Sequence, residues 1–239
     1  MWDDPWAMTL SARLVLAATL LAALYVTARQ LAETYLPIRQ VVVNGAQRPE
    51  TRAALAQIVP KLKGSLFSMD LDNARQKFEG IPWVRKAQVS RVWPERLRID
   101  LAEHVPVASW NGSATLNVQG EVFAVAPWPA LPDIHAPEGM ELEVARHYEE
   151  YTRILGRSGL RIGSLHVDAR HAWRLELASA DLPRPLGVDL GRERMAERLQ
   201  RFVAYYPLVA AHSGSVRRVD MRYPNGFAVE AAPTAESKT

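Results

Sequence analysis

The stretch from residue 84 to residue 103 decides the fold of the region around it and reads Val-Arg-Lys-Ala-Gln-Val-Ser-Arg-Val-Trp-Pro-Glu-Arg-Leu-Arg-Ile-Asp-Leu-Ala-Glu. It predicts two strands, Val84–Trp93 and Arg96–Glu103, joined through a Pro-Glu pair. Along the second strand, apolar residues such as Leu97 and Leu101 alternate with arginines and an aspartate. This alternation indicates an antiparallel sheet with one solvated face and one face packed under helices.

The residues before this pair predict one further strand and two helices. Strand Ile38–Asn44 contains three consecutive valines and ends at an Asn-Gly turn. Helix Thr51–Val59 follows, and helix Asp70–Phe78 begins at Asp70, whose carboxylate can cap the first turn. Asp70 and Asp72 would also fit a divalent-cation site, but carboxylates at a helix start are better explained by capping. The unit is therefore predicted to be β-α-α-β-β.

From Ala108 onward the pattern predicts a β-rich module with two helices, Leu142–Leu155 and Arg192–Tyr206. The stretch Pro127–Pro137 is predicted to be a loop. The predicted strands of this module are Thr115–Val118, Glu121–Val125, Arg161–Asp168, Trp173–Ala178, Leu186–Leu190, Val216–Tyr223 and Phe227–Ala231. The last two strands are joined by Pro-Asn-Gly, which is a short hairpin signal. The fold class of the whole chain is therefore α+β.

One face of the second helix carries Arg194, Arg198 and Arg201, with Glu193 and Glu197 close by. Side chains three or four positions apart on a helix can pair, so we expect a solvated face with salt bridges. This interpretation gives the arginines no role in binding.

Near the N-terminus, Leu14–Ala28 is an uncharged apolar run between two arginines. A helix of this length covers only about 22 Å of a hydrocarbon core of about 30 Å. The apolar character extends over residues 10–31, and the flanking arginines can reach opposite interfaces with their guanidinium groups. We expect a transmembrane helix over residues 13–32.

Two other interpretations of this apolar run stay open. A cleaved signal peptide is one, because Val26-Thr27-Ala28 passes for a small-residue cleavage site. A signal peptide begins with a positively charged segment. The residues before Arg13 oppose this interpretation, because they include Asp3 and Asp4 and no Lys or Arg. A buried core helix is the other, but a helix that is apolar on all sides at one terminus has no body to surround it.

The composition narrows the classes of function, because a chain without cysteine can hold neither a disulfide framework nor a thiolate zinc site. The net charge is +3, and 26 acidic residues are interleaved with 29 basic ones, which does not favour nucleic acid as a partner. The sequence contains no P-loop, no Gly-x-Ser-x-Gly elbow and no His-Glu-x-x-His motif. His166 and His171 are expected to lie at a solvent-facing turn rather than to bind a metal. We therefore expect no enzymatic activity, no cofactor and no metal site.

The C-terminal strand is the candidate binding surface. A last strand followed by a polar tail tends to form a sheet edge, with unpaired N–H and C=O groups that another chain can use. A partner strand beside Phe227–Ala231 would gain backbone hydrogen bonds, with Arg222, Tyr223 and Glu230 giving specificity. From the pattern alone, the simpler interpretation is that these residues complete the sheet of their own domain.

The segments Ile81–Trp110 and Val219–Val229 together resemble the FtsQ/DivIB family of bacterial cell-division proteins. The matching positions in the first segment are Trp83, Val84, Ala87, Val89, Arg91, Trp93, Pro94, Leu97, Ile99, Glu103, Pro106, Ala108 and Trp110. With the apolar run and the β-α-α-β-β unit in order, the resemblance covers nearly the whole chain. The alternative is a POTRA-containing envelope-assembly or secretion component, because POTRA units of this kind also occur in those proteins.

The domain ranges that the resemblance implies are a cytoplasmic tail at residues 1–12, a transmembrane helix at 13–32, a POTRA domain at 36–105, a β domain at 106–232 and a disordered tail at 233–239. It also implies a single-pass protein of the bacterial inner membrane at the division septum, with a cytoplasmic N-terminus and a periplasmic bulk. The family is a non-enzymatic divisome scaffold that links early and late division proteins and helps control septal peptidoglycan synthesis.

The partners that the resemblance implies are FtsB and FtsL, small single-pass division proteins captured by strand addition, together with other divisome proteins. Membrane lipid is contacted through one helix, no nucleic acid is expected, and a homodimer is left open. The implied partner-binding residues are Arg222, Tyr223, Asn225, Gly226, Phe227, Ala228, Val229 and Glu230. A Trp often closes this strand in gammaproteobacterial members, but Glu230 and Ala231 stand there in this chain. The strand-edge mechanism still applies, since it depends on backbone groups.

Overall fold

The computed structural model describes residues 5–35, 38–62, 65, 68–156, 158–180, 182–211 and 216–231, and for residues 5–8 and 32–35 the backbone alone. The chain divides into two compact units, one ending at Glu103 and the other beginning at His104. The expected polar tail at residues 233–239 lies outside the described residues.

Helix α1 (Pro5–Tyr35) contains the apolar run and extends beyond it at both ends. By length and composition, Thr9–Leu31 is long and apolar enough to cross a membrane. Its 23 residues rise about 35 Å along a helix, which exceeds a hydrocarbon core of about 30 Å. The hydroxyl of Thr19 donates to the carbonyl of Val15 at 3.0 Å, and that of Thr27 donates to the carbonyl of Ala23 at 2.6 Å. These bonds satisfy hydroxyls that hydrocarbon could not solvate.

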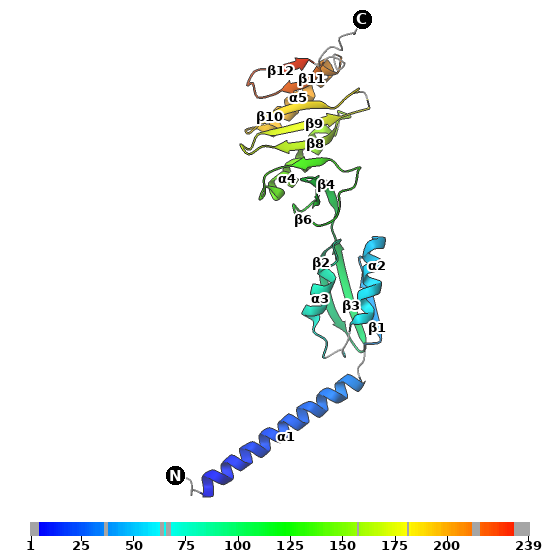
Figure 1. Cartoon of the computed structure of the whole chain (residues 1–239), viewed down its shortest axis with the longest axis vertical. Coiled ribbons are helices and arrows are strands. Elements are labelled where there is room, and N and C mark those ends of the chain that lie inside the picture. The colour runs from blue at the N-terminus through cyan, green and yellow to red at the C-terminus, as the bar shows by residue number, and fades with distance from the viewer. Residues whose placement is uncertain are drawn as a thin grey trace. The chain divides into compact units, whose positions relative to one another are not determined.

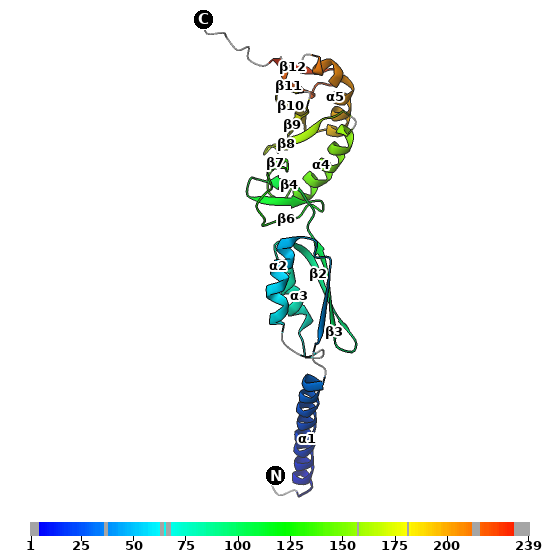
Figure 2. The same cartoon turned by 90° about the vertical axis from the view of Figure 1, so that its right-hand side faces the viewer.

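The rest of the first unit has the predicted β-α-α-β-β order. Its elements are β1 (Gln40–Asn44), α2 (Pro49–Ile58), the 3-10 turn η1 (Val59–Lys61), α3 (Leu71–Glu79), β2 (Val84–Val92) and β3 (Arg96–Glu103). The three strands form one sheet in the order β1-β3-β2, with β1 parallel and β2 antiparallel to β3. Helices α2 and α3 cover one face of this sheet (Figure 2).

Local chemistry explains the details of this unit. The side chain of Asp70 accepts a hydrogen bond from the backbone N–H of Asn73 at 3.0 Å, which confirms the predicted cap of α3. The alternation in β3 places Leu97, Ile99 and Leu101 in the core. Gly45 has a φ of +84°, and a Cβ there would lie 2.0 Å from the carbonyl oxygen of Leu101, so only glycine fits this turn.

The second unit is a single large sheet with two helices. Its elements are β4 (Pro106–Trp110), β5 (Ala114–Asn117), β6 (Val122–Phe123), β7 (Asp133–His135), α4 (Glu141–Leu155), β8 (Arg161–Val167), β9 (Trp173–Ala178), β10 (Leu186–Gly191), α5 (Met195–Ala210), β11 (Val216–Asp220) and β12 (Ala228–Ala231). The nine strands are ordered β12-β11-β10-β9-β8-β7-β4-β5-β6 (Figure 1). Both helices lie on one face (Figure 2) and bury the apolar residues of the central strands.

In this unit, the prediction of a loop and the predicted bounds of a helix were wrong. Pro127–Pro137 was predicted to be a loop, but it contains β7, which is parallel to both β4 and β8 and joins them. Helix α5 starts at Met195 rather than Arg192, because Arg194 has a left-handed φ of +51°. The helix continues through Pro207 to Ala210, since Val209 is buried in the core beneath it.

Candidate partner-binding edge

Strand β12 is the terminal strand of the nine-stranded sheet. It pairs antiparallel with β11 on one side, and among the described residues no strand pairs with its other side. All four of its residues are exposed. The two interpretations of the sequence are therefore compatible, because β12 completes the sheet of its own domain and also leaves one row of backbone groups for another strand.

The loop between β11 and β12 is held by a single arginine of α5. Arg201 donates from Nη2 to the carbonyl oxygens of Met221 at 3.2 Å and Tyr223 at 2.9 Å, and from Nη1 to that of Pro224 at 2.5 Å. These carbonyls belong to a loop, so no neighbouring strand supplies N–H donors to them. A planar guanidinium with several N–H donors is well suited to satisfy them. We call this set of contacts the Arg201 clamp.

The Arg201 clamp corrects the prediction of a solvated, salt-bridged face on this helix. Arg201 is partly buried, and so is Arg198, which donates from Nη1 to the carbonyl of Leu190 at 2.5 Å. Gly191 has a φ of +77°, and a Cβ there would lie 2.7 Å from Nη1 of Arg198. The arginines thus hold the ends of β10 and β11 instead of pairing along the helix.

Arg222 is engaged within the chain rather than projecting freely. Its Nε and Nη2 contact the two carboxylate oxygens of Asp220, the shorter contact being 2.6 Å, and its backbone N–H donates to the same carboxylate at 3.0 Å. The Arg222 side chain is the main reason that the pKa of Asp220 lies below its ordinary value, and Asp220 in turn raises the pKa of Arg222. An anionic group on a partner would have to compete with Asp220 for this guanidinium.

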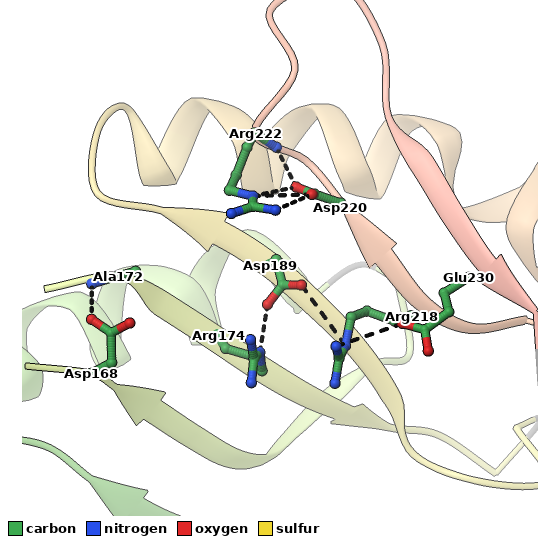
Figure 3. A network of polar contacts seen from close by, with 8 residues as sticks. All are labelled: Asp168, Ala172, Arg174, Asp189, Arg218, Asp220, Arg222 and Glu230. Carbon is green, nitrogen blue, oxygen red and sulfur yellow. Dashed lines mark hydrogen bonds and ion pairs between the residues drawn. The ribbon is translucent and has the colours of Figure 1, made fainter. Parts of the chain in front are cut away.

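A chain of ion pairs crosses the sheet face opposite the helices and ends at the edge strand (Figure 3). Asp189 on β10 lies 2.5 Å from Nε of Arg174 on β9 and 3.8 Å from Nε of Arg218 on β11. Arg218 lies 3.6 Å from Glu230 on β12, which is also 4.0 Å from Arg217. Glu230 is therefore paired within its own domain, and this face of the edge is charged but balanced.

The other face of the edge is apolar. Val229 lies directly opposite Val219 in the register and shares its face, but it is 54% exposed whereas Val219 is buried. The ring of Phe227 packs against that of Tyr205 on α5 at 5.4 Å between centroids. Tyr223 in the loop is 55% exposed. A strand that alternates apolar and charged side chains would thus match both faces of β12.

The structure places the predicted site residues in three different settings. Ala228, Val229 and Glu230 lie on β12, whereas Phe227 precedes the strand and packs on α5. The segment Arg222–Gly226 lies in the connecting loop. The predicted tight Asn-Gly hairpin turn is wrong, because Asp220 pairs with Ala228 and leaves seven residues between the strands. Gly226 does not have a positive φ.

Sequence reasoning missed the residues that support this edge. The Arg201 clamp and the Asp189–Arg218–Glu230 ion pairs join residues far apart in the chain. The arginine spacing on α5 was a visible signal, but it did not reveal which acceptors the guanidinium groups would meet. Sequence pattern alone could identify the donors and not their partners.

The two histidines singled out in the sequence lie on β8 and in the turn that follows it. His171 has a left-handed φ of +60° in the turn after β8, and His166 lies on β8 beside His135 of β7. Over the described part of the chain, no group of three or more His, Asp or Glu side chains could hold a metal ion.

Comparison with known proteins gives the family. Residues 36–104 match the POTRA domain of the FtsQ type, and residues 108–222 match the C-terminal domain of cell division protein FtsQ/DivIB. Cell division protein FtsQ of Neisseria gonorrhoeae is 32% identical over 98% of this chain and 96% of its own length. FtsQ of Bordetella pertussis is 36% identical over 77% of this chain and 73% of its own length. The chain belongs to the FtsQ/DivIB family.

This FtsQ/DivIB chain also matches FtsQ of Shewanella oneidensis with 40% identity, over 70% of this chain and 63% of that relative. The family is one of non-catalytic division proteins, and the apolar helix α1 fits a single-pass membrane protein. The match to the C-terminal domain ends at residue 222, so β12 and most of its loop lie beyond it.

Proposed function

We propose that the chain is a non-enzymatic scaffold of the bacterial division machinery that links early and late division proteins. The observation that carries the proposal is the open, exposed edge of β12, which borders a sheet formed mostly by the segment that matches the FtsQ/DivIB C-terminal domain. A scaffold of this kind acts by holding other proteins in place, so it needs binding surfaces rather than a nucleophile and a base. Control of septal peptidoglycan synthesis then follows from which proteins it brings together.

The proposed location is the inner membrane at the division septum. Helix α1 crosses the bilayer once, with its N-terminus in the cytoplasm and both folded units in the periplasm. The length and apolar character of Thr9–Leu31 support the span. Confinement to the membrane surface raises the effective concentration of single-pass partners confined there as well.

The proposed partners at the β12 edge are FtsB and FtsL, through a strand added beside Ala228–Ala231. Backbone hydrogen bonds would supply most of the affinity. Specificity would come from the apolar face, where Phe227 packs on Tyr205 and Val229 is exposed, and from the charged face around Glu230. The Arg201 clamp supports this proposal because it presents the strand in one conformation before the partner arrives.

The test measures capture of FtsB by the purified full-length chain in detergent. Tyr223→Glu is expected to weaken capture at least about ten-fold, because it places a charge on an exposed aromatic beside the edge. The matched control is Trp128→Glu, since Trp128 is a comparably exposed aromatic in a loop of the same unit.

Circular dichroism and thermal unfolding must show that both variants keep the fold. Loss of capture by Tyr223→Glu alone supports the β12 edge as the site. Equal capture by wild type and Tyr223→Glu would remove the edge from the proposal, and absence of capture by wild-type protein would contradict FtsB as the partner.

A further inference from the structure

The turn between β2 and β3 presents a large exposed aromatic side chain. The turn consists of Trp93, Pro94 and Glu95, and Trp93 is 61% exposed. The hairpin that carries it extends to one end of the β-α-α-β-β part of the first unit (Figure 2). Tryptophan is enriched at protein interfaces and at membrane–water interfaces, because its ring is apolar and its N–H is polar.

Two arginines lie on the open face of the sheet next to this turn. Arg96 and Arg98 alternate with the buried Leu97 on β3, and both are exposed. Their register neighbours on β1 are Gln40 and Val42, neither of which is acidic. Among the described residues, no carboxylate forms an ion pair with either arginine.

The single carboxylate of the turn is already compensated. Glu95 lies 3.1 Å from Nε of Arg39, and its backbone carbonyl accepts from the N–H groups of Arg39 and Gln40. The turn, the start of β1 and the two arginines therefore form one positively charged surface with Trp93 beside it. We call it the hairpin-end surface.

The covalent chain keeps the hairpin-end surface near the outer end of α1. Tyr35 ends that helix, and Arg39 is bonded to the turn through Glu95. The four residue steps from Tyr35 to Arg39 span at most about 14 Å even when fully extended. Leu31 ends the apolar span, and the four further residues to Tyr35 rise only about 6 Å along the helix, within the thickness of a headgroup layer.

We infer that the hairpin-end surface docks on anionic phospholipid, with Trp93 in the headgroup zone and Arg96 and Arg98 against lipid phosphates. Tryptophan favours this zone because its ring is apolar and its N–H is polar. Guanidinium groups bind phosphate oxygens in bidentate fashion and are attracted to an anionic membrane surface. The inference rests on the proposed membrane span of α1 and adds that the first unit is held against the bilayer by one end of its sheet.

The test uses the full-length chain in nanodiscs of phosphatidylcholine, or of equal parts phosphatidylcholine and phosphatidylglycerol. Subtracting the tryptophan emission of Trp93→Phe from that of wild type isolates Trp93, and Trp128→Phe isolates a control that is 46% exposed in the other unit. Lipids brominated near the headgroup should quench Trp93 and leave Trp128 unquenched.

Arg96→Gln and Arg98→Gln should each lower the docked-to-free ratio in anionic discs about five-fold. The charge control is Arg161→Gln, which changes an exposed arginine of β8.

Quenching of Trp93 that needs phosphatidylglycerol and falls with the two arginine variants supports the inference. Equal quenching of Trp93 and Trp128, or no effect of the arginines, overturns it. Carbonate extraction of the chain from vesicles tests the span itself. If the chain resists extraction and still captures FtsB while Trp93 is unquenched, the inference fails and the proposed function stands. If carbonate extracts the chain, the span fails and the inference fails with it.

Discussion

The edge strands β2 of the first unit and β12 of the second unit differ in the side-chain contacts at their outer edges. On β2, the backbone N–H of Ala87 donates at 3.2 Å to the carboxylate of Glu79, which also accepts from Arg75 at 2.7 Å. On β12, no described side chain hydrogen-bonds to the strand backbone, and the loop before it is fixed by Arg201 instead.

The difference suggests that the edge of β2 is protected against pairing, whereas the edge of β12 is left open for a partner strand. A carboxylate that occupies an outward N–H blocks pairing at that position, which is one way in which proteins avoid association at sheet edges. A clamp on the preceding loop leaves the strand's own groups available and removes conformational freedom that a partner would otherwise have to restrict. One sheet thus has a blocked position at its edge, and the other has an open edge that we propose is prepared for binding.

The largest expected effect comes from removing the Arg201 clamp. Arg201→Ala takes three donors from loop carbonyls and should weaken FtsB capture by about 2 kcal/mol, which is about thirty-fold in affinity. Hydrogen exchange at Ala228–Ala231 should accelerate, because β12 loses its fixed connection. Arg201→Lys should recover little, since an ammonium group lacks the planar fork.

The control for this prediction is Arg174→Lys. Arg174 lies on the charged face and contacts Asp189 through a single short pair, so a lysine can replace much of the interaction. If Arg201→Ala binds FtsB as wild type does, the clamp does not prepare the edge, and the contrast between the two edges disappears.

Opening the blocked position on β2 should have the next largest effect. Glu79→Ala removes the acceptor from Ala87 and from Arg75 and should lower the free energy of unfolding of the first unit by about 1–2 kcal/mol. Self-association should rise with protein concentration, as measured by sedimentation velocity. Asp72→Ala is the control, because Asp72 is 87% exposed and its contact with Arg75 is longer, at 3.5 Å. Unchanged self-association of Glu79→Ala would show that the carboxylate does not block the edge.

Acidification should loosen the β12 loop through Asp220. Its pKa is held below the ordinary value of 3.8, first by the side chain of Arg222, so the folded state favours the carboxylate. This contribution to stability is complete above pH 3.8 and is lost as the pH falls from there through the depressed pKa. Chemical denaturation between pH 5 and pH 2.5 should show a smaller acid-induced loss for Asp220→Asn than for wild type. Identical pH dependence of the two proteins would exclude this role.

The smallest effect is expected at Glu230. Its pairs with Arg217 and Arg218 are long and half-exposed, so Glu230→Ala should change the free energy of unfolding by less than about 1 kcal/mol. If Glu230→Ala lowers the free energy of FtsB binding by more than it lowers the free energy of unfolding, Glu230 contacts the partner directly. Glu176→Ala on the same sheet face, where Glu176 accepts from Ser164, is the matched control.

Several features of the fold could be predicted from the sequence, because they depend only on residues that are close together in the chain. The cap at Asp70 needed only the backbone of Asn73, and the alternation in β3 placed Leu97 and Ile99 inside. Strand β7 was missed because its three residues lie in a proline-rich stretch and become a strand only between β4 and β8. The tight turn at Asn225-Gly226 was wrong because the register of β11 and β12 is determined by pairing and by the Arg201 clamp.

The sequence by itself determined the apolar span of α1, the β-α-α-β-β order and the family. The apolar span and the element order follow from composition and from periodicities of two to four residues, which act over single helices and strands. The family follows from the resemblance of the segments Ile81–Trp110 and Val219–Val229. Only the tertiary structure decided that β12 is the last of nine strands, that Arg201 holds its loop and that Glu79 accepts from the backbone of β2. Strand order and the acceptors of a side chain depend on segments that meet when the chain closes, and local patterns carry no information about which segments meet.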